Sequence, residues 1–316
     1  MINDRYSQRI KWIDTSRGIC MLMILLFHTD VYYNEDVLIP YQMYVHNALA
    51  AFFIISGYLF YLKGDISCKQ RITSIIKRLI IPYFIFTFII MCIKVPVKGE
   101  KFDILEILSG DASWFVSTLI IIELLFTIIY NRIKLPIPFL FVISIIFLII
   151  SAFVILPGIL SVIPIAMVFF CIGMIWNRLS SKIVIKNKCS NILTTVTFCI
   201  LIGIIKVIEY HNDMTMTMYY VNISNWALFF ADALLFMPII ISLSKYISHI
   251  KFINFIGRNS LYYYFMCGGI PYMVSLCIKK ICDFNQYNIP VFIIAYIIVI
   301  CITTFVVRFI TKIINR

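Results

Sequence analysis

The chain has 316 residues, of which 62% are apolar and 13% are charged, and its mean hydropathy is +0.98. Soluble domains are about 45–50% apolar and about 25% charged, so this composition excludes a soluble globular protein, and its low polarity also excludes a disordered chain. The net charge of +12 fits a partner such as nucleic acid or anionic lipid, and also the orientation signal of membrane proteins. We predict an all-α polytopic membrane protein.

Ten stretches approach the length of about 20 mostly apolar residues that a transmembrane helix requires. In chain order they are residues 12–30, 46–62, 79–95, 114–130, 135–156, 161–177, 192–210, 224–243, 259–278 and 290–311. The first stretch is followed by no small-residue cleavage site, so we interpret it as a retained helix rather than a signal peptide. Because only short connections are left, we expect one transmembrane domain over residues 1–316 with no fused soluble domain.

The basic residues are distributed unevenly between these stretches. If the N-terminus is cytoplasmic, most of the 27 Lys and Arg residues fall in the N-terminal segment, the even-numbered connections and the C-terminal tail, whereas the outer loop 31–45 holds none. This bias is the positive-inside rule. Both termini are therefore predicted to be cytoplasmic, and no nucleic-acid partner is needed to explain the charge.

The first stretch carries four ionisable residues, Asp14, Arg17, His28 and Asp30. Charged groups within a membrane are costly and usually face a polar interior. The spacing of Arg17 and His28 is about 20° beyond three full helical turns, so both are predicted to lie on one face, roughly 16 Å apart along the axis. Asp14 lies one turn before Arg17. The pattern fits a histidine that acts as a general base, and it equally fits a structural histidine hydrogen-bonded to another helix.

The segment 69–82 is basic and amphipathic and leads into the third stretch. Arg71 and Arg78 are predicted to share a helix face there, and guanidinium groups suit phosphates, although positive-inside anchoring explains the same residues. In the second stretch, Ser56-Gly57 permits close helix packing. Ser56 alternatively lines a polar site, and it is not in the Gly-x-Ser-x-Gly turn of a nucleophile.

Two further acidic residues, Glu123 and Asp232, lie deep in the fourth and eighth stretches, where each is a candidate partner for Arg17 or His28. Trp114 begins the fourth stretch at the outer interface, where an aromatic belt is expected. The ten cysteines show no metal-ligand spacing. No metal site is predicted, and we interpret the cysteines as small apolar residues of a helix bundle.

Five motifs, in chain order, resemble those of the acyltransferase family 3 membrane proteins, which transfer acyl groups, often acetyl, to cell-surface glycans and other acceptors. They are KWIDTSRGICMLMILLFH (11–28), FFIISGYLF (52–60), IKRLIIPY (76–83), SWFVSTLIIIELL (113–125) and FIGRNSLYYYF (255–265). The first motif has the family's Arg and His with ten residues between them, and the layout of ten stretches is also similar.

The resemblance implies an integral membrane O-acyltransferase, most often an O-acetyltransferase, of a bacterial cytoplasmic membrane. Acetyl-CoA or another acyl-CoA would be the cytoplasmic co-substrate, with no permanently bound cofactor, and the acceptor would be a hydroxyl of a cell-surface or lipid-linked polysaccharide. His28 would be the general base, Arg17 would place the donor or stabilise the oxyanion, and Glu123 would orient a partner. The implied substrate-binding residues are Asp14, Ser56, Arg71, Arg78, Trp114, Asn259 and Ser260.

One departure from the family concerns a second histidine. Family members often place a His shortly after the Asn-Ser element, where this chain has Phe265-Met266-Cys267-Gly268. His28 is therefore the remaining in-span candidate base, and a non-catalytic member of the same fold stays an alternative.

A transporter or flippase is the other alternative, in which Arg17, Glu123 and Asp232 would line a path for an ion or substrate. No internal repeat supports this reading. The tyrosine-rich outer loops 31–45 and 211–223 would suit stacking of an acceptor sugar, but a membrane-interface belt has the same composition. The sequence does not indicate an oligomeric state.

Overall fold

The computed structural model of the chain describes residues 10–34, 37–62, 66–98, 103–154, 156–180, 188–281 and 289–314. The predicted cytoplasmic residues 1–9 and most of the predicted loop 178–188 lie outside this part. The described residues are almost entirely helical, as expected, apart from one small β-hairpin. They form two compact units, the Arg78 unit (Leu49–Pro238) and the His28 unit (Ile10–Ala48 with Ile239–Arg316), and each unit is described by itself.

The Arg78 unit contains most of α2 and the first half of α10, with all elements between them. These are α2 (Val45–Leu62), α3 (Cys68–Ile75), η3 (Ile76–Ile80), α4 (Ile81–Lys98), α5 (Ile104–Ser109), η4 (Asp111–Ser113), α6 (Trp114–Phe126), η5 (Thr127–Ile133), α7 (Ile137–Phe153), η6 (Gly158–Ser161), α8 (Ile163–Ser180), α9 (Lys188–His211), β1 (Met216–Thr217), β2 (Asn222–Ile223) and α10 (Trp226–Tyr246). The two strands pair antiparallel, with Met216 opposite Ile223.

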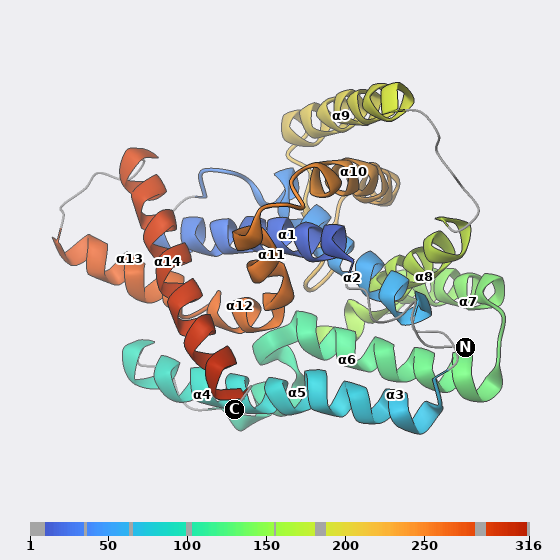
Figure 1. Ribbon diagram of the computed structural model, residues 1–316, viewed down its shortest axis with the longest axis horizontal. Helices are drawn as coiled ribbons and strands as arrows, with labels where there is room; N and C mark the ends of the chain where they lie inside the picture. The colour runs from blue at the N-terminus through green and yellow to red at the C-terminus, as the bar shows by residue number, and fades with distance from the viewer. Residues whose placement is uncertain are drawn as a thin grey trace. The chain divides into compact units, whose positions relative to one another are not determined.

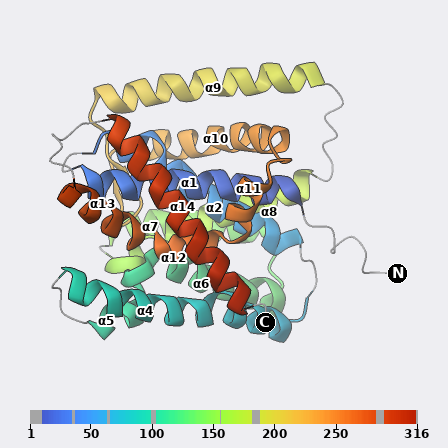
Figure 2. The same cartoon turned by 60° about the vertical axis from the view of Figure 1, so that its left-hand side comes forward.

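The His28 unit is built around the first helix and the last four. Its elements are α1 (Lys11–Tyr33), η2 (Tyr41–Met43), α11 (Lys251–Arg258), α12 (Ser260–Met266), α13 (Ile270–Ile281) and α14 (Ile289–Ile314), with the first residues of α2 and the end of α10. Figure 2 shows α14 as one unbroken helix.

The third predicted stretch, 79–95, begins earlier than the sequence analysis placed it. Ser67 caps α3 by accepting a hydrogen bond from the amide of Gln70, which is the usual way to satisfy a free helix N-terminus. From there α3, η3 and α4 follow one another as a single rod (Figure 1). The predicted loop 63–78 is therefore largely helix, because apolar residues and a capping serine continue the helical pattern through its basic half.

Seven helices among the described residues are long and apolar enough to cross a membrane. They are residues 45–62, 68–93, 111–133, 163–180, 193–211, 226–246 and 289–314. Large apolar side chains are exposed along several of them, for example Leu193, Ile200 and Val207 on α9. Such faces are unusual on a soluble monomer, and they are the surface expected of helices that contact lipid.

The three other predicted stretches differ from a plain span. The stretch 259–278 is not one helix but α12 and α13, which are bent by 45° at a short break. The stretch 135–156 is the shorter apolar helix α7. The stretch 12–30 is α1, whose 23 residues are long enough but include Asp14, Arg17 and Asp30. All three are helical as predicted, and the number of spans and the side on which the termini lie stay predictions.

Candidate active site

Arg17 and His28 lie on one uninterrupted helix, α1. Because the helix is regular between them, the two side chains share a face at a separation of roughly three turns, or about 16 Å along the axis. Both residues are half-buried, whereas many of their neighbours on the helix are fully buried. Half-burial places each side chain where it is shielded from bulk solvent and still accessible from one side.

The imidazole of His28 is surrounded by aromatic rings. It stacks on Tyr32, with ring centroids 6.3 Å apart, and meets the edge of Phe27 at 5.8 Å. Tyr32 in turn contacts Tyr272 of α13 at 5.4 Å. Within the described residues, no group hydrogen-bonds to either ring nitrogen of His28. The structural alternative, a histidine hydrogen-bonded to another helix, therefore lacks support among these residues.

The C-terminal end of α1 is fixed by Asp30. Its buried carboxylate accepts hydrogen bonds from Asn34 Nδ2 at 2.7 Å and from the backbone amides of Leu38 and Ile39 at 3.1 Å. A buried carboxylate requires such partners. Asp30, which lies two residues after His28, thus holds the loop that follows α1, and its role is structural.

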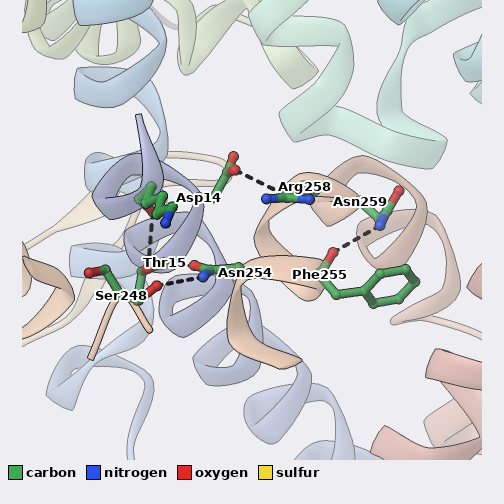
Figure 3. A network of polar contacts seen from close by, with 8 residues as sticks. Asp14, Thr15, Ser248, Asn254, Phe255, Arg258 and Asn259 are labelled. Carbon is green, nitrogen blue, oxygen red and sulfur yellow. Dashed lines mark hydrogen bonds and ion pairs between the residues drawn. The ribbon is translucent and has the colours of Figure 1, made fainter. Parts of the chain in front are cut away.

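The other end of α1 is held by a polar network with α11 (Figure 3). The Asp14 carboxylate pairs with Arg258 Nε at 3.2 Å. Thr15 donates a hydrogen bond to Asn254 Oδ1 at 2.6 Å, and Asn254 donates to the Ser248 carbonyl at 2.7 Å. Because Asp14 and Thr15 lie three and two residues before Arg17, the network positions the stretch of helix that carries this arginine.

Two glycines allow this contact. A side chain at Gly18 would overlap with the carbonyl of Ile253, and one at Gly257 would overlap with the carbonyl of Asp14. Interfaces between membrane helices commonly use small residues in this way, since the backbones then approach closely. The contact between α1 and α11 therefore depends on Gly18 and Gly257 as much as on the polar side chains.

Asn259 and Ser260, which the resemblance assigns to substrate binding, lie at the junction of α11 and α12. Asn259 donates from Nδ2 to the Phe255 carbonyl at 2.9 Å (Figure 3), and Ser260 is buried. The observed contacts are structural, and a substrate contact stays a prediction. Further along, Cys267 and the two glycines after it form the break between α12 and α13, where the family's second histidine is missing.

In the Arg78 unit, Arg78 and Glu123 form an ion pair, with Nη2 and Oε2 2.5 Å apart. The side chain of Glu123 is 7% exposed and that of Arg78 is 43% exposed. Arg78 lies in η3, and Glu123 lies just before η5; both segments are π-helical. Such wide turns are rare and often mark functional sites. The structure thus supplies Glu123 with a partner from its own unit, and its predicted orienting role stays a prediction.

Arg71 differs from Arg78 in its surroundings. It is buried, its Nη1 donates to the Phe60 carbonyl at 2.9 Å, and its guanidinium lies over the Phe60 ring at 3.9 Å. The prediction that the two arginines share a face assumed a regular α-helix, but the π-helical η3 changes the angle per residue between them. Arg71 fixes α3 against α2, while the side chain of Arg78 is 43% exposed.

Ser56 and Trp114 complete the predicted set. Ser56 is half-buried on α2, beside Gly57, where a side chain would overlap with the Phe170 carbonyl of α8. The prediction of close packing at Ser56-Gly57 is therefore confirmed. Trp114 begins α6 and stacks on Tyr219, with ring centroids 5.3 Å apart. The sequence analysis did not name Tyr219.

A cluster of buried charges was missed by the sequence analysis. Lys206 of α9 pairs with Glu209 at 2.9 Å and with Asp232 of α10. Both carboxylates are fully buried. Asp232 was identified from its depth, whereas Lys206 and Glu209 were not identified as site candidates. The pair Lys206 and Glu209, three residues apart on a helix, is a local pattern that signals an interacting pair.

The predicted site residues fall into two groups. Asp14, Arg17, His28, Asn259 and Ser260 belong to the His28 unit, and Ser56, Arg71, Arg78, Trp114 and Glu123 belong to the Arg78 unit. Among these, the structure pairs Arg78 with Glu123 directly. Asp14 lies on the polar contact of α1 with α11, where it pairs with Arg258, whereas Asn259 bonds to the Phe255 carbonyl of α11 (Figure 3).

These features define a polytopic helical membrane protein with an arginine and an unbonded histidine on one helix. A family model described as an acyltransferase domain matches residues 10–308, which is nearly the whole chain and includes both units. The chain therefore belongs to the acyltransferase family 3, as its motifs indicated, and is a multi-pass membrane acyltransferase. No curated protein matches the chain, and no solved structure matches it.

Proposed function

We propose that this acyltransferase is an O-acyltransferase that moves an acetyl group from cytoplasmic acetyl-CoA to a hydroxyl of a cell-surface or lipid-linked polysaccharide. The observation that supports this most is His28: it is half-buried among aromatic rings, has no hydrogen-bond partner among the described residues, and shares a helix with Arg17. A general base must have a nitrogen free to take a proton from its substrate.

In the proposed reaction, the acceptor hydroxyl oxygen attacks the carbonyl carbon of the thioester while His28 takes the hydroxyl proton. The carbon–sulfur bond of the tetrahedral intermediate then breaks, and His28 returns the proton to the departing thiolate. The products are the O-acetyl ester and CoA with a free thiol. Arg17 lies about 16 Å from His28 along the helix axis, and we assign it to the negatively charged part of the donor, away from the reacting carbon.

For the phosphates of the donor we propose Arg78, which has the more exposed guanidinium of the two candidate arginines. Its pairing with Glu123 leaves the remaining nitrogens of the guanidinium, which presents five N–H donors, for a second partner. Arg71 contributes by holding α3 against Phe60.

The proposal is tested with the purified full chain in lipid nanodiscs. Radiolabelled acetyl-CoA and a glycan fraction from the expressing cells are added, and label in the glycan and release of free thiol are both measured. We expect His28→Gln to lower transfer by about 10²–10⁴-fold, the usual contribution of a general base. His249→Gln, which changes an exposed histidine in the described chain, is the matched control. Transfer by His28→Gln at the unaltered rate contradicts the proposal.

The buried Lys206–Glu209–Asp232 cluster is the observation that favours the transporter alternative, because ionisable groups within membranes often lie on ion or substrate paths. That alternative predicts movement of a glycan across a liposome membrane without acyl-CoA. Dependence of all glycan change on acyl-CoA, with no such movement, rejects it.

A further inference from the structure

Two connections that are far apart in the sequence meet in the Arg78 unit. The Tyr219 hydroxyl, on the turn between β1 and β2, lies 3.3 Å from Oδ1 of Asp111 in η4. The Tyr219 ring stacks on Trp114, with an angle of 22° between the ring planes. The sequence analysis placed both connections on the outer side of the membrane, and their contact agrees with a common side.

The turn that carries Tyr219 has an unusual backbone. Tyr220 and Val221 adopt positive φ angles of 57° and 46°, a region that side chains other than those of Gly, Asn and Asp rarely occupy, and for β-branched Val it is an outlier. The hairpin is anchored by two buried side chains, Met216 in β1 and Met218 directly after β1. Strained backbone of this kind persists where the surroundings enforce it, and it concentrates at functional sites.

The strained turn presents an exposed ring. The Tyr220 side chain is 65% exposed, although its ring centroid lies 4.1 Å from that of Tyr219. The hydroxyls of the two tyrosines are 3.2 Å apart. Trp114, Tyr219 and Tyr220 therefore form a continuous row of rings, which we name the aromatic platform, with the last ring open to solvent.

A carboxylate lies at the edge of the platform. Asp111 is fixed by Ser109, which donates from Oγ to Oδ2 at 2.8 Å, and each carboxylate oxygen retains a second lone pair for another donor. Burial, the hydrogen bond with Tyr220 and the negative charge of Asp111 raise the pKa of the Tyr219 phenol, so it stays a proton donor at neutral pH. A membrane-interface anchor needs only the rings, whereas this arrangement adds an ordered acceptor and donor beside them.

We propose that Tyr219, Tyr220 and Asp111, together with Trp114, bind one pyranose ring of the glycan acceptor. The apolar C–H face of the sugar packs on the exposed Tyr220 ring, as apolar groups pack on aromatic faces, and its hydroxyls donate to Asp111 and accept from a tyrosine hydroxyl. The assignment of an acceptor rests on the proposed function, but binding of a sugar to the aromatic platform is measurable without any transfer.

Trp114 supplies the signal for the test. The full chain in nanodiscs is titrated with two neutral probes, an N-acetylglucosamine tetramer and maltotetraose, and tryptophan fluorescence is recorded. We expect a saturable change with at least one probe, and an apparent affinity about tenfold weaker in Tyr220→Ala, the effect of losing one stacked ring. The change should be absent in Trp114→Phe, which identifies Trp114 as its source.

The matched control is Tyr210→Ala, which removes another exposed tyrosine, 57% exposed, from the end of α9 and should bind the probe as the unaltered chain does. Thermal unfolding of each variant verifies that it is folded. No saturable change with either probe, or equal affinity in Tyr220→Ala, overturns the proposal.

A second measurement separates this proposal from the proposed function. Sugar binding that depends on Tyr220, in a chain that releases no thiol from acetyl-CoA, contradicts the proposed reaction and supports the platform. Transfer in which Tyr220→Ala raises the acceptor KM about tenfold, with the acetyl-CoA KM unchanged, supports both. Transfer with an unchanged acceptor KM in Tyr220→Ala overturns the platform alone.

Discussion

The two units each contain a pair of helices whose backbones touch, but the side chains around the two contacts differ. In the His28 unit, α1 meets α11 at Gly18 and Gly257, beside the Asp14–Arg258 ion pair and the Thr15–Asn254 hydrogen bond. In the Arg78 unit, α2 meets α8 at glycines 57 and 173, beside aromatic contacts such as that of Phe60 with Phe170.

The difference indicates what each contact does. Between membrane helices the hydrophobic effect contributes little, so close packing and hydrogen bonds hold the pair. Packed rings resist separation but tolerate small shifts along the helix, whereas a set of directional hydrogen bonds is satisfied at one position only. Arg17 and His28 lie on the helix whose contact is fixed by directional bonds. Such a fixed position suits a helix whose side chains must meet a substrate.

The largest effect is expected when a methyl group is added to a glycine at each of the two helix contacts. Gly257→Ala and Gly57→Ala each place a side chain against a backbone carbonyl, and we expect a loss of about 2–3 kcal/mol in each, the upper range for overpacking. Thermal unfolding in detergent measures the loss. Only Gly257→Ala should also lower acyl transfer per folded molecule, because it displaces the helix of Arg17 and His28.

Gly203→Ala on α9 is the control, since a side chain there meets no atom within 4 Å, and its stability should be unchanged or slightly higher. If Gly57→Ala and Gly257→Ala lower the activity per folded molecule equally, the two contacts do not differ in the way inferred.

Removing one charge from the polar contact has the next largest effect. Arg258→Ala leaves Asp14, whose side chain is only 8% exposed, without its ion-pair partner Arg258. Loss of one partner from a fully buried pair costs about 3–5 kcal/mol, and because the Arg258 side chain is 46% exposed, we expect about 1–2 kcal/mol. Lys251→Ala, on an exposed position of the same helix, should cost almost nothing. A double-mutant cycle with Asp14→Asn that is fully additive refutes the pairing.

Two buried threonines sharpen the comparison further. The Thr15 hydroxyl lies 2.6 Å from Asn254 Oδ1 of another helix and 3.0 Å from the Lys11 carbonyl of its own helix. Thr118 of α6 donates to the Trp114 carbonyl of its own helix, and both threonines are fully buried. Thr15→Val should lower stability by about 1 kcal/mol because it leaves a buried acceptor unsatisfied. Thr118→Val should be close to neutral, since that carbonyl keeps its helical amide. Equal unfolding midpoints for the two variants contradict the interpretation.

The smallest effect is expected at the aromatic contact. Asn177 of α8 donates from Nδ2 to the Tyr58 carbonyl of α2 at 3.0 Å. Asn177→Leu removes this bond and keeps the volume, so we expect a loss of about 0.6 kcal/mol, the average for such bonds in a membrane protein. Chemical unfolding with a mild detergent series resolves this difference. A loss as large as that of Arg258→Ala shows that polar bonds dominate both contacts.

Much of the fold was predictable because it depends on local composition. Every predicted stretch overlaps a helix, since a run of apolar residues of sufficient length has few alternatives in a bilayer. The break at Cys267–Gly269 was not predicted, although the Gly268-Gly269 dipeptide is a turn signal. The β-hairpin was missed because its strands are two residues each, too short for a periodic pattern.

The site was predictable where it is local and not where it depends on tertiary contacts. The shared face of Arg17 and His28 follows from the helix period alone. The partners Arg258 and Asn254 were missed because they come from a helix at the opposite end of the chain, and no spacing rule links such positions. The π-helical η3 was not predicted from the sequence either. The expected common face of Arg71 and Arg78 assumed a regular α-helical pitch, which the chain does not keep between them.

The separation of 239 residues between Thr15 and Asn254 has a consequence for synthesis in the cell. At about 5–20 residues per second, the ribosome needs roughly 12–48 s to synthesise the chain from Thr15 of α1 to Asn254 of α11. During that interval Asp14, Thr15 and Gly18 have no α11 to pack against. The helix with the candidate catalytic pair is thus made long before the helix that fixes its polar end.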